Sequence, residues 1–218
     1  KGNAEINNGG NFNNNAGSTL NNESGAKIDG SQPISNGGDI NNDGNIKTTV
    51  ENTEDGKVDA EVTWTDKDGN EHSGSLKDVL EYLKENPEEA SGAKVELNKD
   101  VEVTEPLEVP SGAELSVPDG TKLEVKPEGT LDNNGTVSVG EGGSLDNNGT
   151  VNNNEGGKLE NSGDLNNNSS LKNDGELENK GTVSNNENGN LENNGTIDNK
   201  ENAEINNGGN FNNNAGST

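Results

Sequence analysis

Residues 129–151 read GTLDNNGTVSVGEGGSLDNNGTV, and this stretch decides the fold. Within it, Leu131, Val137, Leu145 and Val151 follow one another at intervals of six or eight positions. Side chains of an extended strand alternate between its two faces, so an even spacing keeps all four on the same side. Between them lie Asn, Gly, Asp and Ser, which favour turns. The pattern predicts very short strands, each with one inward aliphatic side chain and a corner after it.

The same spacing continues to the end of the chain, at Leu159, Leu165, Leu171, Leu177, Val183, Leu191, Ile197, Ile205 and Phe211. Three strands per coil would stack one residue every 20 positions, in the series Leu131, Val151, Leu171, Leu191 and Phe211. We therefore predict a mainly β fold, a three-sided parallel β-solenoid with about 20 residues per rung and asparagine ladders at its corners. A coil of two strands, with about 12 to 16 residues per rung, is the less regular alternative.

Composition alone favours a disordered chain. Hydrophobic residues make up 22% of the sequence, and the formal net charge is −26. Such a chain buries too little apolar surface to offset the entropy of ordering. Solenoids need less apolar surface, because their stability accumulates from contacts between neighbouring rungs. The periodicity therefore outweighs the composition.

The charge and the missing cysteines exclude several classes of function. Against 41 acidic residues the chain has 15 basic ones, all lysine. This balance disfavours nucleic-acid partners and anionic membrane surfaces. With no cysteine, disulfides, thiolate metal sites and cysteine catalysis are excluded. The chain starts at Lys1 with neither a signal peptide nor an apolar span, so we expect a piece of a longer protein and no membrane insertion.

A second repeat has a much longer period. Residues 3–19, NAEINNGGNFNNNAGST, recur identically as residues 202–218. We interpret this as tandem repetition of a 199-residue unit, with an engineered duplication as the alternative. Read in this way, the six-or-eight spacing continues past the C-terminal end through Leu20, Ile28, Ile34, Ile40 and Ile46.

Three regions follow from these patterns. Residues 1–49 are expected to be terminal solenoid rungs of the preceding repeat, forming a separate short solenoid or stacking on a neighbouring chain. Residues 50–92 lack the solenoid spacing and are expected to form an α/β cap. Residues 93–218 are the main solenoid, beginning with the aliphatic pairs Val95/Leu97, Val101/Val103, Leu107/Val109, Leu115/Val117 and Leu123/Val125.

The cap is predicted to be a hairpin followed by one helix. Strands are expected at about 58–73, where VDAEVTWT alternates in polarity and DKDGN forms a turn. A helix is expected at about 76–86, with Ser75 and Asp78 as a capping box and an end before Pro87. Its apolar stripe is predicted to cover the open end of the main solenoid, and consists of Leu76, Val79, Leu80 and Leu83.

The segments SGAKVELNKDVEVTEPLEVPSGAELSV and GTLDNNGTVSVGEGGSLDNNGTV resemble the pectate-lyase-like right-handed parallel β-helix of bacterial surface proteins. The GTLDNNGTV units are similar to those of filamentous-haemagglutinin-type adhesins. The resemblance covers residues 90–218 and, through the long repeat, residues 1–46. It implies an architecture and an extracellular location at the bacterial cell surface. Polysaccharide lyases of this class commonly use calcium bound by Asp together with a basic residue such as Arg, and this chain contains no Arg.

One candidate metal site stands out in the sequence. Asp39, Asn41 and Asp43, followed by Gly44, match the beginning of an EF-hand loop and could hold Ca²⁺. The twelfth position is Val50 instead of the bidentate Glu that the loop requires. GDINNDGNI also has the form of GTLDNNGTV, which favours an ordinary solenoid rung.

Two other polar groups have simpler interpretations. Asp66, Asp68 and Asn70 could supply oxygen ligands, but DKDGN is typical of a hairpin turn. His72, the only histidine, has no second histidine or nucleophile in a recognisable motif, so we expect a surface residue. No cofactor is expected apart from the possible calcium.

The favoured function is a structural repeat unit of a long extracellular bacterial stalk, fibre or adhesin, and not an enzyme. Its expected partners are neighbouring identical repeats, linked covalently or head to tail. The alternative is a solenoid binding module that contacts glycan or host protein, with or without Ca²⁺. Clustered exposed aromatic residues on one face would favour that alternative.

Overall fold

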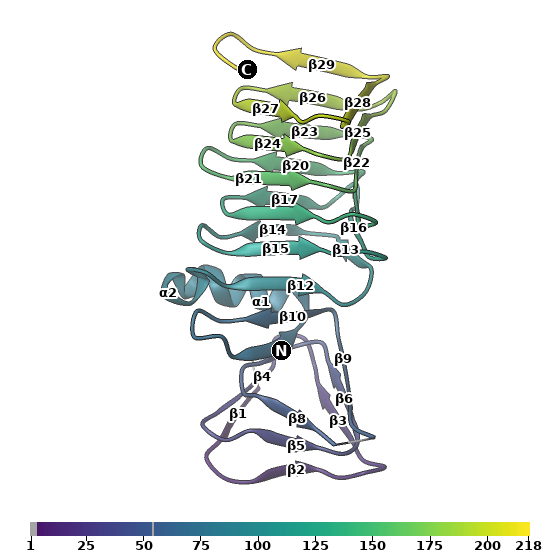
Figure 1. Ribbon diagram of the computed structural model, residues 1–218. Helices are drawn as coiled ribbons and strands as arrows, with labels where there is room; N and C mark the ends of the chain where they lie inside the picture. The colour runs from purple at the N-terminus through teal and green to yellow at the C-terminus, as the bar shows by residue number, and fades with distance from the viewer. Residues whose placement is uncertain (1–3, 54) are drawn as a thin grey trace.

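The computed structural model describes residues 4–53 and 55–218 as a rod of stacked strands (Figure 1). An N-terminal solenoid (residues 5–60) and a C-terminal solenoid (residues 94–213) lie at the two ends of the rod. Between them is the junction (residues 62–90), a hairpin followed by two short helices. One eleven-stranded sheet runs through all three parts. The predicted mainly β fold, a parallel solenoid with a small helical element, is confirmed.

The C-terminal solenoid has three faces of parallel strands. Its first face contains β12 (Lys94–Leu97), β15 (Glu114–Val117), β18 (Thr136–Val139), β21 (Lys158–Asn161), β24 (Glu176–Asn179) and β27 (Thr196–Asn199). Its second face contains β13 (Val101–Val103), β16 (Lys122–Val125), β19 (Ser144–Asn147), β22 (Asp164–Asn167), β25 (Thr182–Asn185) and β28 (Glu204–Asn207). Its third face contains β14 (Pro106–Val109), β17 (Thr130–Asn133), β20 (Thr150–Asn153), β23 (Ser170–Asn173), β26 (Asn190–Asn193) and β29 (Asn210–Asn213).

The predicted 20-residue stacking is present on the third face. Leu131 pairs with Val151, Val151 with Leu171, and Leu171 with Leu191, which in turn pairs with Phe211. Three strands therefore complete one rung, and the two-strand coil is excluded. Rungs on the other faces vary around this length because their corners differ.

Each strand of this solenoid from β12 to β26 buries two side chains, and from β17 onward this is one more than the spacing predicted. In β17, Leu131 and Asn133 are buried while Thr130 and Asp132 are half-buried. Near the junction the second inward residue is aliphatic, as in the pair Leu115/Val117, and further along it is asparagine. The aliphatic pairs predicted upstream are all buried in one continuous core.

The inward asparagines form ladders along the rod, as predicted. On the third face, Asn133 Nδ2 donates to Asn153 Oδ1 at 2.8 Å, and Asn153 Nδ2 donates to Asn173 Oδ1 at 2.7 Å. Each Nδ2 also donates to a backbone carbonyl at the corner, for example from Asn153 to Glu176 at 2.8 Å. Buried amides are thereby paired on both sides, which removes the cost of burying them.

Glycine at the corners is required by close approach between rungs. A Cβ on Gly163 would lie 2.3 Å from the carbonyl oxygen of Gly143 in the rung before it. At Gly175 the corresponding distance, to the carbonyl of Gly157, is 2.2 Å. The glycine in units such as NNGT therefore lets one backbone rest directly on the next.

The N-terminal solenoid repeats this architecture in a shorter form. Its three faces contain β1 (Glu5–Asn8), β4 (Lys27–Gly30) and β7 (Asn45–Ile46); β2 (Phe12–Asn14), β5 (Ile34–Asn36) and β8 (Val50–Asn52); and β3 (Thr19–Asn22), β6 (Asp39–Asn42) and β9 (Lys57–Ala60). It has its own core, made by Ile28, Ile34, Ile40 and Ile46. The expected separate short solenoid is therefore present, but it extends to Ala60, beyond the boundary placed at residue 49.

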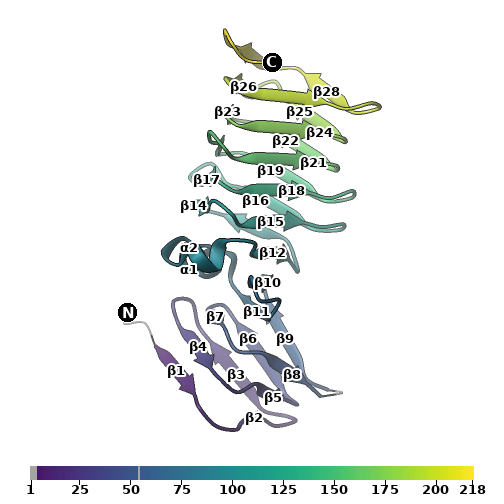
Figure 2. The same ribbon diagram turned by 60° about the vertical axis from the view of Figure 1, so that its left-hand side comes forward.

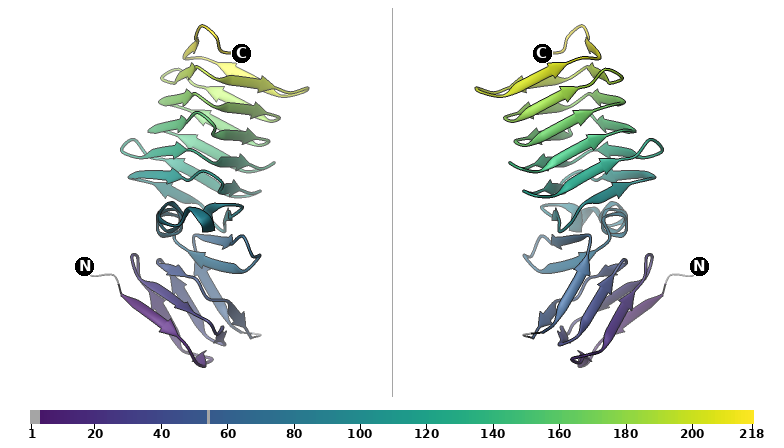
Figure 3. Two further views of the ribbon diagram at one scale, coloured as in Figure 1. Left: turned by 90° about the vertical axis from the view of Figure 1, so that its left-hand side faces the viewer. Right: turned by 90° about the vertical axis from the view of Figure 1, so that its right-hand side faces the viewer.

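The hairpin of the junction joins the two solenoids through one sheet. It consists of β10 (Val62–Thr65) and β11 (Glu71–Gly74), and the sheet order is β7-β11-β10-β12. All three of these pairings are antiparallel, so β7 and β12 run in opposite directions. On the face that the two solenoids share, their strands therefore run in opposite directions. Figures 2 and 3 show the strands of the two solenoids inclined to one another.

Each side of the shared sheet serves a different core. Trp64 pairs with both His72 and Val95, so these three side chains point into the core of the C-terminal solenoid. The next residue, Ser73, pairs with Ile46 and points the other way, toward the core of the N-terminal solenoid. Successive residues of β11 therefore contact two different cores.

The helix α1 (Leu76–Glu85) closes the open end of the C-terminal solenoid. The predicted stripe is buried in that core, at Leu76, Val79, Leu80 and Leu83. Ser75 Oγ accepts from the Asp78 amide at 3.2 Å, which forms the expected N-cap. A second short helix, α2 (Pro87–Ala90), starts at the proline that ends α1.

Candidate functional site at the junction

Among the residues that the structure describes, the aromatic side chains are concentrated at the junction. Trp64 is fully buried, and its ring centroid lies 4.4 Å from that of His72 and 5.7 Å from that of Tyr82. The prediction that His72 is a surface residue is wrong, since only 6% of it is exposed. The hairpin register places it opposite Trp64, inside the core.

Asp66 anchors this cluster from the hairpin turn. Its Oδ1 accepts from the amides of Asp68 and Asn70, each at 2.9 Å, and its Oδ2 lies 3.1 Å from His72 Nε2. The Asn70 side chain donates to Oδ2 at 3.0 Å. Burial alone would raise the pKa of Asp66, but the hydrogen bonds from Asn70, His72 and the turn amides outweigh it and hold the pKa far below its ordinary value of 3.8. The turn residues predicted as a hairpin signal thus form a fixed carboxylate site.

The chemistry available to this cluster is limited. His72 contacts Asp66 through Nε2, while its Nδ1 is buried without a partner among residues 4–53 and 55–218. No hydroxyl of the described residues hydrogen-bonds to the imidazole. An Asp–His pair without an adjacent nucleophile positions the ring and locks the hairpin. We interpret the cluster as a structural lock, and the absence of enzyme activity stays a prediction.

Polar contacts join the N-terminal solenoid to helix α1 of the junction. Asp78 Oδ2, in the first turn of α1, accepts from the Gly25 amide at 2.8 Å. Lys47 Nζ donates to the Tyr82 hydroxyl and lies 4.8 Å from the ring centroid. Burial by itself would lower the pKa of Lys47. The contacts with Tyr82 and with nearby carboxylates raise the pKa by more than burial lowers it, so the net shift is upward.

The end of the N-terminal solenoid is only partly covered by the hairpin. A cavity of about 270 Å³ remains there, lined by Val50 and Val58 from the solenoid and by Thr63 and Glu71 from the hairpin. At this level only the face that ends in β7 continues into the hairpin, whereas the other two faces end at β8 and β9.

The chain matches no family model, no curated protein and no solved structure. Among the described residues, no helix is long and apolar enough to span a membrane.

The residues predicted for calcium lie in an ordinary rung. Asp39 and Asn41 are exposed on β6, with Ile40 buried between them, and Asn41 Nδ2 donates to Asn21 Oδ1 at 2.9 Å. Asp43 follows the strand and is also exposed. The segment is extended, as the GDINNDGNI pattern indicated, and the described residues contain no group of three acidic or histidine side chains placed to hold a metal. Calcium binding at this segment stays a prediction.

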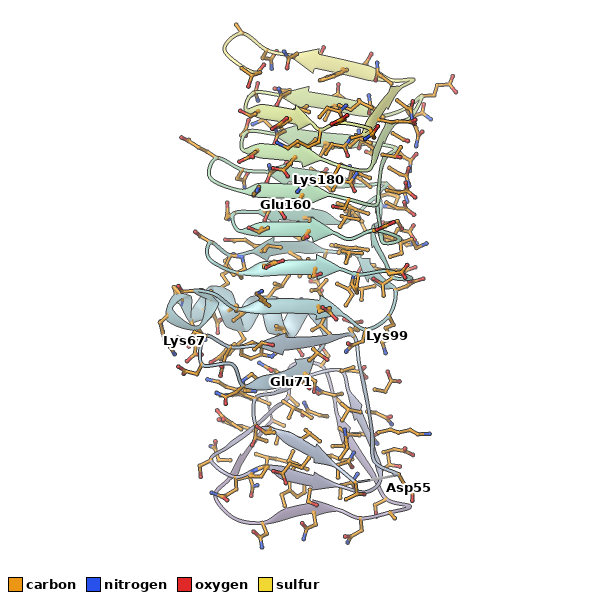
Figure 4. All side chains as sticks on the ribbon, in the orientation of Figure 1. Asp55, Lys67, Glu71, Lys99, Glu160 and Lys180 are labelled. Atoms are coloured by element: carbon orange, nitrogen blue, oxygen red, sulfur yellow. The ribbon has the colours of Figure 1, made fainter. Side chains whose placement is uncertain are left out.

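The outer surface of the C-terminal solenoid carries acidic residues with interspersed lysines. Figure 4 shows side chains around every rung, with Glu160 and Lys180 labelled on this solenoid. Lysines bridge successive rungs, as Lys126 does to Glu102 at 3.0 Å and Lys158 to Glu178 at 3.8 Å. Exposed pairs of this kind add little stability each, but they reduce repulsion between stacked carboxylates.

The sequence predicted the asparagine ladders but not the burial of their members, and it missed the Trp64–His72–Asp66 cluster. The signal in the sequence that could have revealed this cluster was the predicted hairpin. A turn centred on residues 66–70 puts Trp64 opposite His72, so burying one buries the other.

Proposed function

We propose that this chain is a structural repeat unit of a long extracellular bacterial stalk or fibre, of the kind that presents an adhesin away from the cell. The observation that carries the proposal is the eleven-stranded sheet, which passes without interruption from one solenoid through the junction into the other. In such a rod each rung is stabilised by contacts with the rungs next to it, so the rod can be long without a large core.

The distribution of aromatic residues supports a stalk over a binding module. The chain has one Trp, one Tyr and two Phe. Trp64 and Tyr82 lie in the junction core or against it, and Phe12 and Phe211 lie in the terminal rungs. The outer faces of the middle rungs are covered by Asn, Asp, Glu, Lys, Ser and Thr. A flat glycan-binding face would need exposed rings, so we place contact with glycan or host protein elsewhere in the parent protein.

The resemblance to filamentous-haemagglutinin-type adhesins and to the pectate-lyase-like β-helix belongs to this proposal as well. It concerns the GTLDNNGTV units and supports the surface location. Neighbouring copies of the same unit are the proposed partners.

The test is the shape of chains with one, two and three 199-residue units. We expect the maximum dimension measured by small-angle X-ray scattering to increase by a constant amount for each added unit. Negative-stain images should show straight or uniformly curved rods. Compact particles, or beads on a flexible string, would refute the stalk.

A further inference from the structure

We infer that successive units share one uninterrupted solenoid, in which the rungs of residues 20–60 of one unit stack directly on the C-terminal rung of the unit before it. This inference rests on the proposed function and specifies its partner, the next copy of the chain. The contact surface is the free edge of β27, β28 and β29.

The repeated segment occupies the same structural position at both ends. As β28 and β29 it forms the last strands of the second and third faces, stacked on β25 and β26. As β1 and β2 it forms the first strands of two successive faces, stacked against β4 and β5. The same two-strand segment therefore occurs twice in the chain. At the C-terminal end it is paired with the strands before it, and at the N-terminal end it is paired with the strands after it.

If the two copies of the segment are superposed as one, so that the solenoids join, the side chains exposed at each end become covered. Phe211 is 39% exposed beside Leu191, and its equivalent Phe12 is stacked on Ile34. Ile6 is 46% exposed beside Ile28, and its equivalent Ile205 is stacked on Val183. In the merged solenoid each of these residues lies between two aliphatic side chains. The large exposed hydrophobic residues of the chain are thus accounted for.

The last residue already establishes the register of the next strand. Thr218 donates from its amide to the Gly195 carbonyl at 3.1 Å and accepts from the Ile197 amide at 2.8 Å. Thr218 corresponds to Thr19, the first residue of β3. The strand that follows Thr218 in a tandem chain is therefore β3 of the next unit, paired in parallel with β27.

This register matches both the core and the ladder. It places Leu20 of the next unit beside Ile197, and both are only half-buried in the single chain. It also places Asn22 beside Asn199, which ends a ladder by accepting from Asn179 at 2.7 Å. The Asn199 amide would donate to the carbonyl of Asn21 in the next unit, continuing the bond between Ile197 and Thr218.

The merged solenoid fixes the axial repeat of the fibre. Its second face would contain eight strands, β13 through β28 followed by β4 and β7 of the next unit. The two hairpin strands and the following β12 complete ten spacings. At about 4.8 Å per spacing the repeat is about 48 Å for each 199-residue unit.

The test uses a two-unit chain, residues 1–218 followed directly by residues 20–218. Segmental labelling of the first unit allows amide exchange at its Asn199 to be followed by NMR. We expect exchange at least tenfold slower than in the single-unit chain, because the amide gains a partner. Scattering should show the second unit adding about 48 Å.

A matched pair of variants locates the effect at the seam. Leu20→Asp in the second unit should lower the urea midpoint and restore fast exchange at Asn199 of the first unit. The same substitution in the first unit changes a half-buried end residue and should leave that exchange slow. If the two-unit chain is extended but Asn199 exchanges equally fast in both chains, the shared solenoid is refuted and the stalk stands. A chain that is not extended refutes the stalk itself.

Discussion

Asn42 donates from Nδ2 to the hydroxyl of Ser73 at 3.0 Å, so an asparagine ladder of the N-terminal solenoid ends on the hairpin. The ladder starts at Asn22, whose Nδ2 donates to Asn42 Oδ1 at 2.7 Å. A ladder that ended in a core would leave its last amide unpaired. Here the serine, on the one strand shared by the two solenoids, accepts that bond.

Ser73→Ala should destabilise the N-terminal solenoid. Asn42 is 1% exposed, so its amide would lose a buried partner at a cost of about 1–3 kcal/mol. Urea unfolding measures the change. Ser73→Thr keeps the hydroxyl and should restore most of the stability, and Ser116→Ala, on an outward position of β15, should have little effect. Equal losses at Ser73 and Ser116 would show that the ladder does not depend on the hairpin.

Asn167→Ala should interrupt a ladder in the middle of the rod. Asn167 accepts from Asn147 at 2.7 Å and donates to Asn185 at 2.8 Å. We expect a loss of about 1–3 kcal/mol for each buried group left unpaired, measured by chemical denaturation. The control is the neighbouring Asn166→Ala, which removes a partly exposed bond to Asp146 and should cost less than about 1 kcal/mol. If the two variants lose equal stability, the buried ladder contributes no more to stability than the exposed hydrogen bonds do.

Gly163→Ala should be among the most destabilising of the small substitutions. The new Cβ would meet the Gly143 carbonyl at 2.3 Å, and the rungs would have to separate at that corner. A cost of about 1–3 kcal/mol is expected from overpacking of this kind. Gly208→Ala, where the nearest atom is 3.7 Å away, is the control and should be nearly neutral. Thermal unfolding followed by circular dichroism distinguishes the two.

Asp66 should make the junction sensitive to acid. Its pKa is lowered on folding, so its contribution is complete above its ordinary value of 3.8 and is lost as the pH falls toward the folded value. The stability difference between the native chain and Asp66→Asn should therefore be largest above about pH 5 and shrink below about pH 4. Fluorescence of Trp64, which stacks on His72, reports the transition. A stability difference that stays constant between about pH 6 and about pH 3 would contradict this prediction.

The rungs could be predicted from the sequence because their geometry is local. An even spacing fixes which side of a strand each residue occupies, so stacks such as Leu131 on Val151 follow directly. The second inward position was harder to predict. Asn133 and its equivalents are polar, and they are tolerated inside only because the next rung supplies a partner at the same corner.

The hairpin and the helix of the junction were predicted from the sequence, but the residue at which the first solenoid ends and the hairpin begins was not. In VDAEVTWT every second residue is apolar from the beginning to the end of the segment. The chain nevertheless passes from the solenoid into the hairpin at Glu61, in the middle of this alternation. Nothing in the alternation marks that break. The hairpin places His72 opposite Trp64, but the burial of both also requires β12 on the other side of β10, and β12 follows only after the two helices.

The narrowness of the shared sheet at β7 has a mechanical consequence. Within each solenoid a pulling force along the rod is divided among three faces, whereas between the solenoids the backbone ladder reduces to two residue pairs, Ser73 with Ile46 and Gly74 with Asn45. We expect a stretched tandem chain to yield first at these points, with one opening event per unit in single-molecule force measurements. The junctions would then act as evenly spaced extensible links that absorb tension while the solenoids between them stay folded.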